Sequence, residues 1–216
     1  GRPRAAVVLW MRVDGDGAIV DSAFHAGKVT VSRNYVYEDP ELLKSEEYES
    51  LSAVTAVAQA KFPLLDAIED SHDVVAYWML KYNLMAAEVL SAAKTGMFRC
   101  APRPEEVTAL PSNHALPLQT RQLLRNWRAG GGSYKSWEDR GPHGGIGDGD
   151  MLYAQATSPI RRMCDLVNTI AIKHACAIGA PCAGATALSR NWLARNNDVS
   201  RAAKAARRLQ SECELL

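Results

Sequence analysis

The side chains best suited to hold a phosphate lie together in the short segment from Thr157 to Arg162. It combines the hydroxyl groups of Thr157 and Ser158 with two adjacent guanidinium groups, Arg161 and Arg162. An arginine guanidinium can bind two phosphate oxygens at once and stays charged at every physiological pH. The segment therefore predicts an anion site, and its chemistry is charge stabilisation rather than nucleophilic attack.

A helix is expected to position this segment. Ser158 is a favoured N-cap residue, and Pro159 suits the first helical position because its missing N–H would have no intrahelical partner. Gly179 and Pro181 end the pattern, so we predict a helix over 159–178. Free N–H groups and the positive dipole at its start would attract phosphate. The apolar residues at helical spacing are Ile160, Met163, Leu166, Val167 and Ile170.

The stretch 153–166 resembles the signature Tyr-x-x-Phe-Thr-Ser-Pro-Ile-Arg-Arg-Tyr-x-Asp-Leu of the RNB catalytic domain, found in ribonuclease II, ribonuclease R and exosome-associated exonucleases. Just upstream, 141–147 is similar to the family's Pro-His-x-Gly-Leu-Gly. The resemblance continues more weakly through 4–20, 28–38, 79–86 and 197–209. It implies that residues 1–216 are the C-terminal portion of an RNB-like domain.

This resemblance also implies roles for single residues. Arg161 matches the family arginine that steadies the scissile phosphate, and Thr157, Ser158 and Arg162 accompany it in binding RNA. Tyr37 matches a tyrosine that stacks near the RNA 3′ end, with a strand-end tyrosine packed on the core as the alternative. The implied partners are single-stranded RNA or ribosomal RNA, together with other proteins of a ribonucleoprotein complex.

The family's hydrolytic centre holds magnesium with a cluster of aspartates, and the sequence has no such cluster. Two acid pairs imitate it, Asp14 with Asp16 and Asp148 with Asp150, but both alternate with glycine as turns do. Four further acids are predicted to form a solvated helix face: Asp66, Glu69, Asp70 and Asp73. We therefore expect no metal site in this chain, and magnesium only where a full family site exists.

Two functions stay open. The first is a catalytically degenerate RNB-like protein that binds RNA or serves as a scaffold in RNA processing. The alternative is part of an active 3′-to-5′ exoribonuclease whose aspartates lie outside this sequence. Ala76, where the family has a glutamate, and the short region 59–73 favour the first. Gly1 in place of an initiator Met favours a trimmed chain.

Net charge and cysteine content limit how the chain could bind RNA and whether metal or disulfide bonds could hold its fold. The net charge of +1 gives no global field that attracts RNA, so basic residues must act locally. Arg201, Lys204 and Arg208 recur near one face of the last helix, either as a phosphate-contacting surface or as a solvated helix end. Five cysteines without a Cys-x-x-Cys pair argue against a zinc knuckle or a disulfide framework.

We expect the protein to be intracellular, either cytoplasmic or organellar, with mitochondria included. A reducing compartment suits the cysteines, of which Cys164 and Cys176 are predicted to be buried. No apolar run approaches the roughly 18–20 residues that span a membrane. His143 is expected to be a loop histidine bonded to the backbone.

The predicted fold class is α+β, an RNB-like domain portion with short N-terminal strands followed by a mainly helical bundle. Apolar alternation on both sides of an Asp-Gly turn predicts a hairpin within the first 37 residues. The predicted helices cover 40–60, 73–93, 116–128, 159–178 and 190–213.

Overall fold

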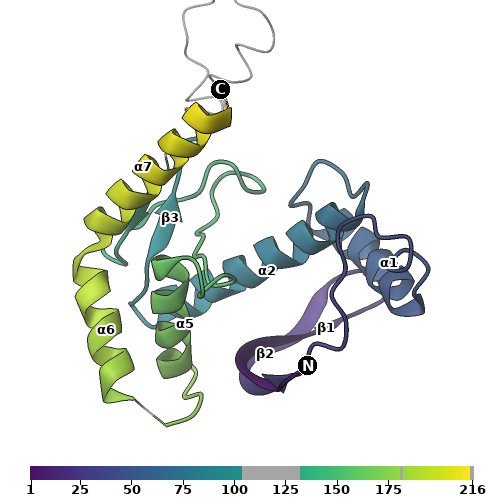
Figure 1. Cartoon of the computed structure of the whole chain (residues 1–216), viewed down its shortest axis with the longest axis horizontal. Helices are drawn as coiled ribbons and strands as arrows, with labels where there is room; N and C mark the ends of the chain where they lie inside the picture. The colour runs from purple at the N-terminus through teal and green to yellow at the C-terminus, as the bar shows by residue number, and fades with distance from the viewer. Residues whose placement is uncertain (104–131, 181, 215–216) are drawn as a thin grey trace, which may run out of the picture.

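The computed structural model describes residues 1–103, 132–180 and 182–214. Two N-terminal strands precede a mainly helical remainder, so the protein has the α+β class that the sequence predicts. Figure 1 shows the hairpin beside the long helix α2 (Ser71–Ala92). Helices α6 (Ala183–Ala194) and α7 (Asn196–Glu214) lie on the opposite side of the molecule, with α5 (Met163–Ala175) between them and the hairpin. The helix predicted over 116–128 lies outside the described residues.

The hairpin consists of β1 (Arg4–Val13) and β2 (Ile19–Val29), paired antiparallel with Leu9 opposite Phe24. Its turn is the predicted one. The Asp14 carboxylate accepts hydrogen bonds from the N–H groups of Asp16 at 3.0 Å and of Ala18 at 2.8 Å. The prediction of strands up to residue 37 is wrong, because no described strand includes residues 30–37.

Glycine is required at the tip of this hairpin. Gly17 has a φ of +81°, and a Cβ there would lie 2.4 Å from the Val57 carbonyl oxygen. The left-handed backbone and the close approach both exclude larger residues. The tip therefore packs directly on the backbone of helix α1 (Glu46–Lys61).

Two side-chain caps determine where the first helices begin. Ser45 accepts the N–H of Tyr48 at the start of α1, and Asp70 accepts the N–H of Asp73 at the start of α2 (Ser71–Ala92). These caps satisfy N–H groups that lack an intrahelical partner. The first helix therefore begins later than the predicted residue 40, and the second begins at Ser71, two residues before the predicted residue 73.

Three helices follow among the described residues of the C-terminal half: α5 (Met163–Ala175), α6 (Ala183–Ala194) and α7 (Asn196–Glu214). The prediction of one helix over 190–213 is wrong, because α6 ends at Ala194 and α7 begins at Asn196, with Arg195 between them. Its neighbours Asn196, Asn197 and Asp198 favour helix ends, since their short polar side chains compete for backbone hydrogen bonds.

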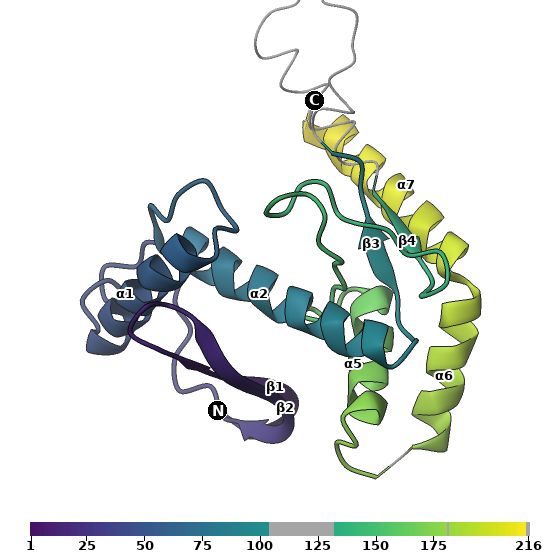
Figure 2. The same cartoon turned by 180° about the vertical axis from the view of Figure 1, so that it is seen from behind.

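A second small sheet joins distant parts of the chain. It pairs β3 (Phe98–Cys100) with β4 (Ser133–Lys135). Tyr134 of β4 donates its N–H to the Ser200 hydroxyl at 2.7 Å, and this hydroxyl donates back to the Tyr134 carbonyl at 3.1 Å. This pair attaches α7 to the sheet, and Figure 2 shows β3, β4 and α7 side by side from behind.

The main core lies between the hairpin, α2 and α5. Phe24, Leu90, Phe98 and Ile172 are buried there, and Phe24 meets Tyr82 edge-to-face at 5.4 Å. Burial of such side chains is the principal source of stability. None of the described helices combines the length and the apolar character needed to cross a membrane.

Candidate nucleic-acid interface

The segment 153–156 leads into the predicted phosphate site and is buried. It belongs to no described strand, and side-chain amides of two helices hydrogen-bond to it instead. Asn83 of α2 accepts the Ala156 N–H at 2.8 Å and donates to the Tyr153 hydroxyl at 2.9 Å. From the other side, Asn168 of α5 donates to the Gln155 carbonyl at 2.8 Å. Both asparagines are fully buried. The two helices therefore clamp the chain immediately before Thr157.

The predicted helix start at Ser158 and Pro159 is wrong. Helix α5 begins at Met163, and Arg162 occupies its N-cap without a side-chain capping bond. Residues 158–161 form a turn in which the N–H groups of Arg161 and Arg162 both reach the Ser158 carbonyl, at 3.2 and 3.1 Å. Ser-Pro suits the start of such a turn as well as the start of a helix. Ile160 is fully exposed and does not belong to the apolar helix face.

Asp165 holds this turn against the helix. Its carboxylate is completely buried and accepts the Ser158 N–H and the Arg162 guanidinium, both at 2.8 Å. The Cys164 thiol donates to its other oxygen at 3.0 Å. Burial raises the pKa of Cys164 to about 12, so this thiol stays protonated and able to donate. The aspartate is thus a positioning residue for the whole segment.

The two adjacent arginines have different surroundings. Arg162 has a side chain 25% exposed and is paired with Asp165. Arg161 is exposed, and none of the ion pairs in the described part of the chain includes it. Of the two guanidinium groups, that of Arg161 is the one left available for an external anion.

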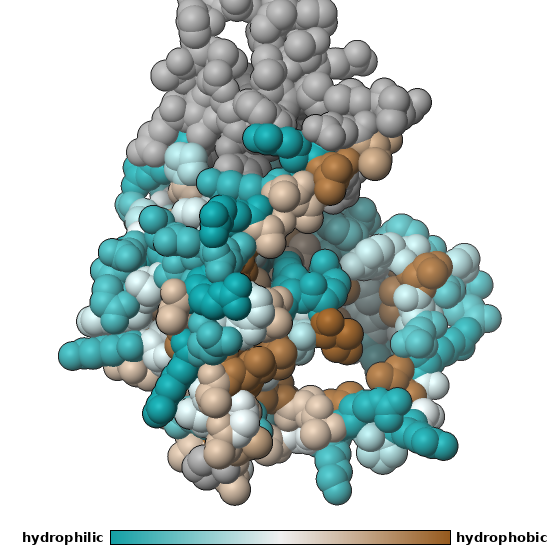
Figure 3. All heavy atoms as spheres, turned by 60° about the vertical axis from the view of Figure 1, so that its left-hand side comes forward, coloured by the Kyte–Doolittle hydropathy of each residue, from teal (hydrophilic) through white to brown (hydrophobic). Residues whose placement is uncertain are grey.

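A groove of about 500 Å³ lies beside the turn, between the open end of the hairpin, α2 and α5. Thr157 and Pro159 line one side of it, and small residues of β1 and β2 line the other. Lys173 contributes a cation. Figure 3 shows a hollow in this face of the molecule with hydrophobic residues on its border. A largely apolar groove with a few polar groups is the usual form of a ligand site.

Tyr37 lies outside any described strand, and its side chain is 55% exposed. Its ring meets the His72 ring edge-to-face at 5.0 Å. The next residue, Glu38, accepts the Ser71 N–H at 2.7 Å, and the Ser71 hydroxyl accepts the Glu38 N–H at 2.9 Å. Hydrogen bonding by the Ser71 side chain and N–H to the carboxylate lowers the pKa of Glu38, and the contacts with Ser71 attach the segment to the start of α2. The alternative of a strand-end tyrosine packed on the core is therefore wrong.

On α7 the predicted basic residues are exposed, but they are not equivalent. Arg201 and Arg195 both bind the Asp198 carboxylate, and these hydrogen bonds lower the pKa of Asp198. Lys204 and Arg208 take part in none of the described ion pairs. Asp198 therefore partly neutralises the charge of Arg201, whereas the charge of Lys204 is not neutralised by any of the described ion pairs.

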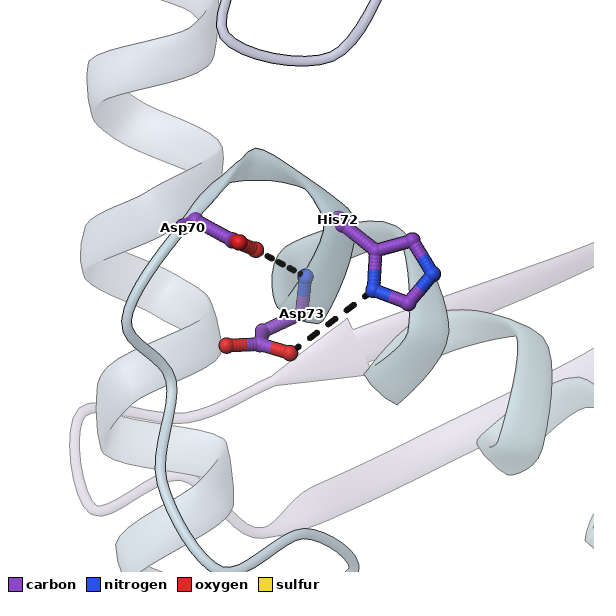
Figure 4. A group of neighbouring side chains, drawn as sticks. All are labelled: Asp70, His72 and Asp73. Atoms are coloured by element: carbon purple, nitrogen blue, oxygen red, sulfur yellow. Dashed lines mark hydrogen bonds and ion pairs between the residues drawn. The ribbon is translucent and has the colours of Figure 1, made fainter.

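The four acids predicted to share a helix face do not do so. Asp66, Glu69 and Asp70 precede α2, and Asp73 alone lies in it. Figure 4 shows Asp70, His72 and Asp73 close together at the helix start. Their ligand atoms lie within 4.8 Å of one another, which is compatible with a metal ion. However, Asp70 caps the Asp73 N–H at 2.8 Å and Asp73 accepts the Glu69 N–H at 2.9 Å, so helix capping accounts for both carboxylates.

Two residues of the glycine-rich loop, Asp148 and His143, make the backbone contacts that the sequence predicts. Asp148 accepts the N–H of Asp150 at 3.1 Å, which confirms a turn. His143 accepts the N–H of Gly145 at 3.4 Å, which confirms a loop histidine bonded to the backbone. Burial, together with the nearby Arg99, lowers the pKa of His143 to about 4, so the ring is neutral at physiological pH.

The two cysteines predicted to be buried differ. Cys164 is buried, as expected, but Cys176 is only half-buried. It stands at the C-cap of α5, where the helix has already ended.

Comparison with models of protein families found no family that matches, and comparison with curated proteins found no significant match.

Proposed function

We propose that this chain is a ribonuclease II-like, RNB-family RNA-binding protein that is catalytically degenerate and acts in RNA processing or in a ribonucleoprotein assembly. The observation that carries the proposal is the turn at residues 158–161. Asp165 and Arg162 hold it in place, and Arg161 remains exposed at its end. The turn therefore presents a charge that the fold does not neutralise.

The neighbouring groove supports the same proposal. Thr157 and Pro159 belong both to the RNB-like segment and to the groove wall, so a phosphate near Arg161 would place the rest of a nucleotide beside an apolar surface. Single-stranded nucleic acid is generally bound by such a combination of local positive charge and apolar contact. RNA, cytoplasmic or organellar, is the ligand proposed here.

Replacing Arg161 with alanine should weaken binding of single-stranded RNA about tenfold or more, because one charge-assisted phosphate contact is lost. The slope of log affinity against log salt concentration should fall by about 0.7, the contribution of one phosphate contact with a single strand. A fluorescence-anisotropy titration at several salt concentrations measures both quantities. Arg190→Ala, an exposed arginine on α6, is the matched control and should change neither. An unchanged slope for Arg161→Ala would contradict the proposed site.

Incubation with magnesium tests whether the chain lacks exonuclease activity. Phosphodiester hydrolysis in this family needs metal-held water, and in the described residues the carboxylates close to one another serve as helix caps and turns. A labelled RNA incubated with the purified chain and magnesium should therefore stay intact over hours. Shortening from the 3′ end that a chelator abolishes would instead favour an active exoribonuclease.

A further inference from the structure

The β1–β2 hairpin has one face against the core and one face in solvent. In an antiparallel pair, residues directly opposite each other point to the same side. Leu9 and Phe24 form such a pair on the inner face, which packs on α2. The outer face therefore carries three pairs toward the middle and tip of the hairpin: Val8 with His25, Trp10 with Ala23, and Arg12 with Asp21.

This outer face exposes an aromatic ring between cations. Trp10 is 48% exposed, an unusual position for the largest apolar side chain. Arg4 and Arg12 lie on the same face at either side of it and are exposed. Neither arginine belongs to any of the ion pairs among the described residues. Asp21 is the acid on this face, so the cations outnumber the acids there.

The groove beside the phosphate turn lies at the open end of the same hairpin. The outer-face pair Ala6 with Gly27 and the inner-face pair Val7 with Ala26 both line it, so the outer face reaches the edge of the groove. Trp10 lies four residues beyond Ala6 on the same strand, about 13 Å away at the usual rise of a strand. A Cβ on Gly27 would come within 2.7 Å of the Val8 side chain, so Val8 covers this glycine between the groove and Trp10.

We propose that the outer face of the β1–β2 hairpin is a second contact surface for single-stranded RNA, with a base stacked on Trp10 and phosphates beside Arg4 and Arg12. This inference rests on the proposed RNA-binding function and extends its site. Alternation of an exposed aromatic with unpaired cations suits a polyanion with flat bases. A protein partner would require a larger contiguous apolar area than Val8, Trp10 and Val29 provide on this face.

Replacing Trp10 with alanine should weaken binding of a fluorescein-labelled oligouridylate of roughly 12 nucleotides by about five- to 150-fold. Trp10→Phe should retain most of the affinity, because a phenyl ring still offers a stacking face. Leu51→Ala, which truncates an exposed apolar side chain on α1, is the control and should bind as the wild type does. Circular dichroism of each variant checks that the fold is retained.

Asp21 gives a test of opposite sign. Asp21→Asn removes the negative charge from the outer face and should strengthen binding by about two- to fivefold at low salt. Trp10→Ala with wild-type affinity, while Arg161→Ala binds weakly, would overturn the hairpin surface alone and point to another partner for that face. Equal losses in Trp10→Ala and Trp10→Phe would overturn stacking. A wild-type chain that does not bind the oligonucleotide would overturn both proposals.

Discussion

Replacing Asp165 with alanine should lower the free energy of unfolding by roughly 3–5 kcal/mol, since it leaves the Arg162 guanidinium and the Ser158 N–H without their buried partner. For a domain of this size the melting temperature should fall by roughly 6–20 °C. Thermal unfolding followed by circular dichroism measures the change. RNA affinity should fall as well, because the turn that presents Arg161 is no longer held.

Asp198→Ala provides the matched control. It also removes a carboxylate bound by arginine, but this carboxylate lies on the exposed start of α7. Exposed ion pairs contribute little because water and salt screen them. A melting temperature for Asp165→Ala no lower than that for Asp198→Ala would show that Asp165 does not hold the turn.

The second large effect is expected at Asn168. Its side-chain amide accepts the Met97 N–H at 2.8 Å and donates to the carbonyls of Met97 at 2.9 Å and Gln155 at 2.8 Å. Asn168→Ala should leave three buried backbone groups without partners and cost about 3 kcal/mol or more. Urea denaturation gives the free energy and shows whether the m-value is unchanged.

Asn191, exposed on α6, offers the comparison for this variant. Asn191→Ala should change stability by no more than about 0.5 kcal/mol, because alanine favours a helix and no buried group loses a partner. If Asn168→Ala were as stable as Asn191→Ala, the buried amide would not be needed to hold the extended segment.

Local patterns were sufficient to predict much of the fold. The Asp-Gly turn with apolar alternation predicted the hairpin, and long helical periodicity predicted α2. Boundaries were less predictable. Arg195 alone separates α6 from α7, and the three polar residues after it form the first turn of α7; similar residues also occur inside helices, where packing outweighs propensity.

The candidate site shows the same limit at single-residue scale. A helix starting at Pro159 would place Arg161 and Asp165 at i and i+4, where an ion pair forms readily. Because α5 begins at Met163, Asp165 instead binds Arg162, three residues before it. The sequence contains both possibilities, and only the position of the turn decides which arginine remains available. The exposed Trp10 gave no signal either, because an apolar residue in a strand usually points to the core.

The two buried asparagines also limit how the helices can move. Asn83 of α2 and Asn168 of α5 hold the adjacent residues Ala156 and Gln155. Apolar contacts between two helices can re-form after one slides by a turn, about 5.4 Å, but these hydrogen bonds cannot. The pair therefore sets the axial register of α2 against α5. A ligand that enters the groove therefore meets a fixed spacing on the side formed by α2 and α5. On that side selectivity would come from the ligand's shape rather than from adaptation of the protein.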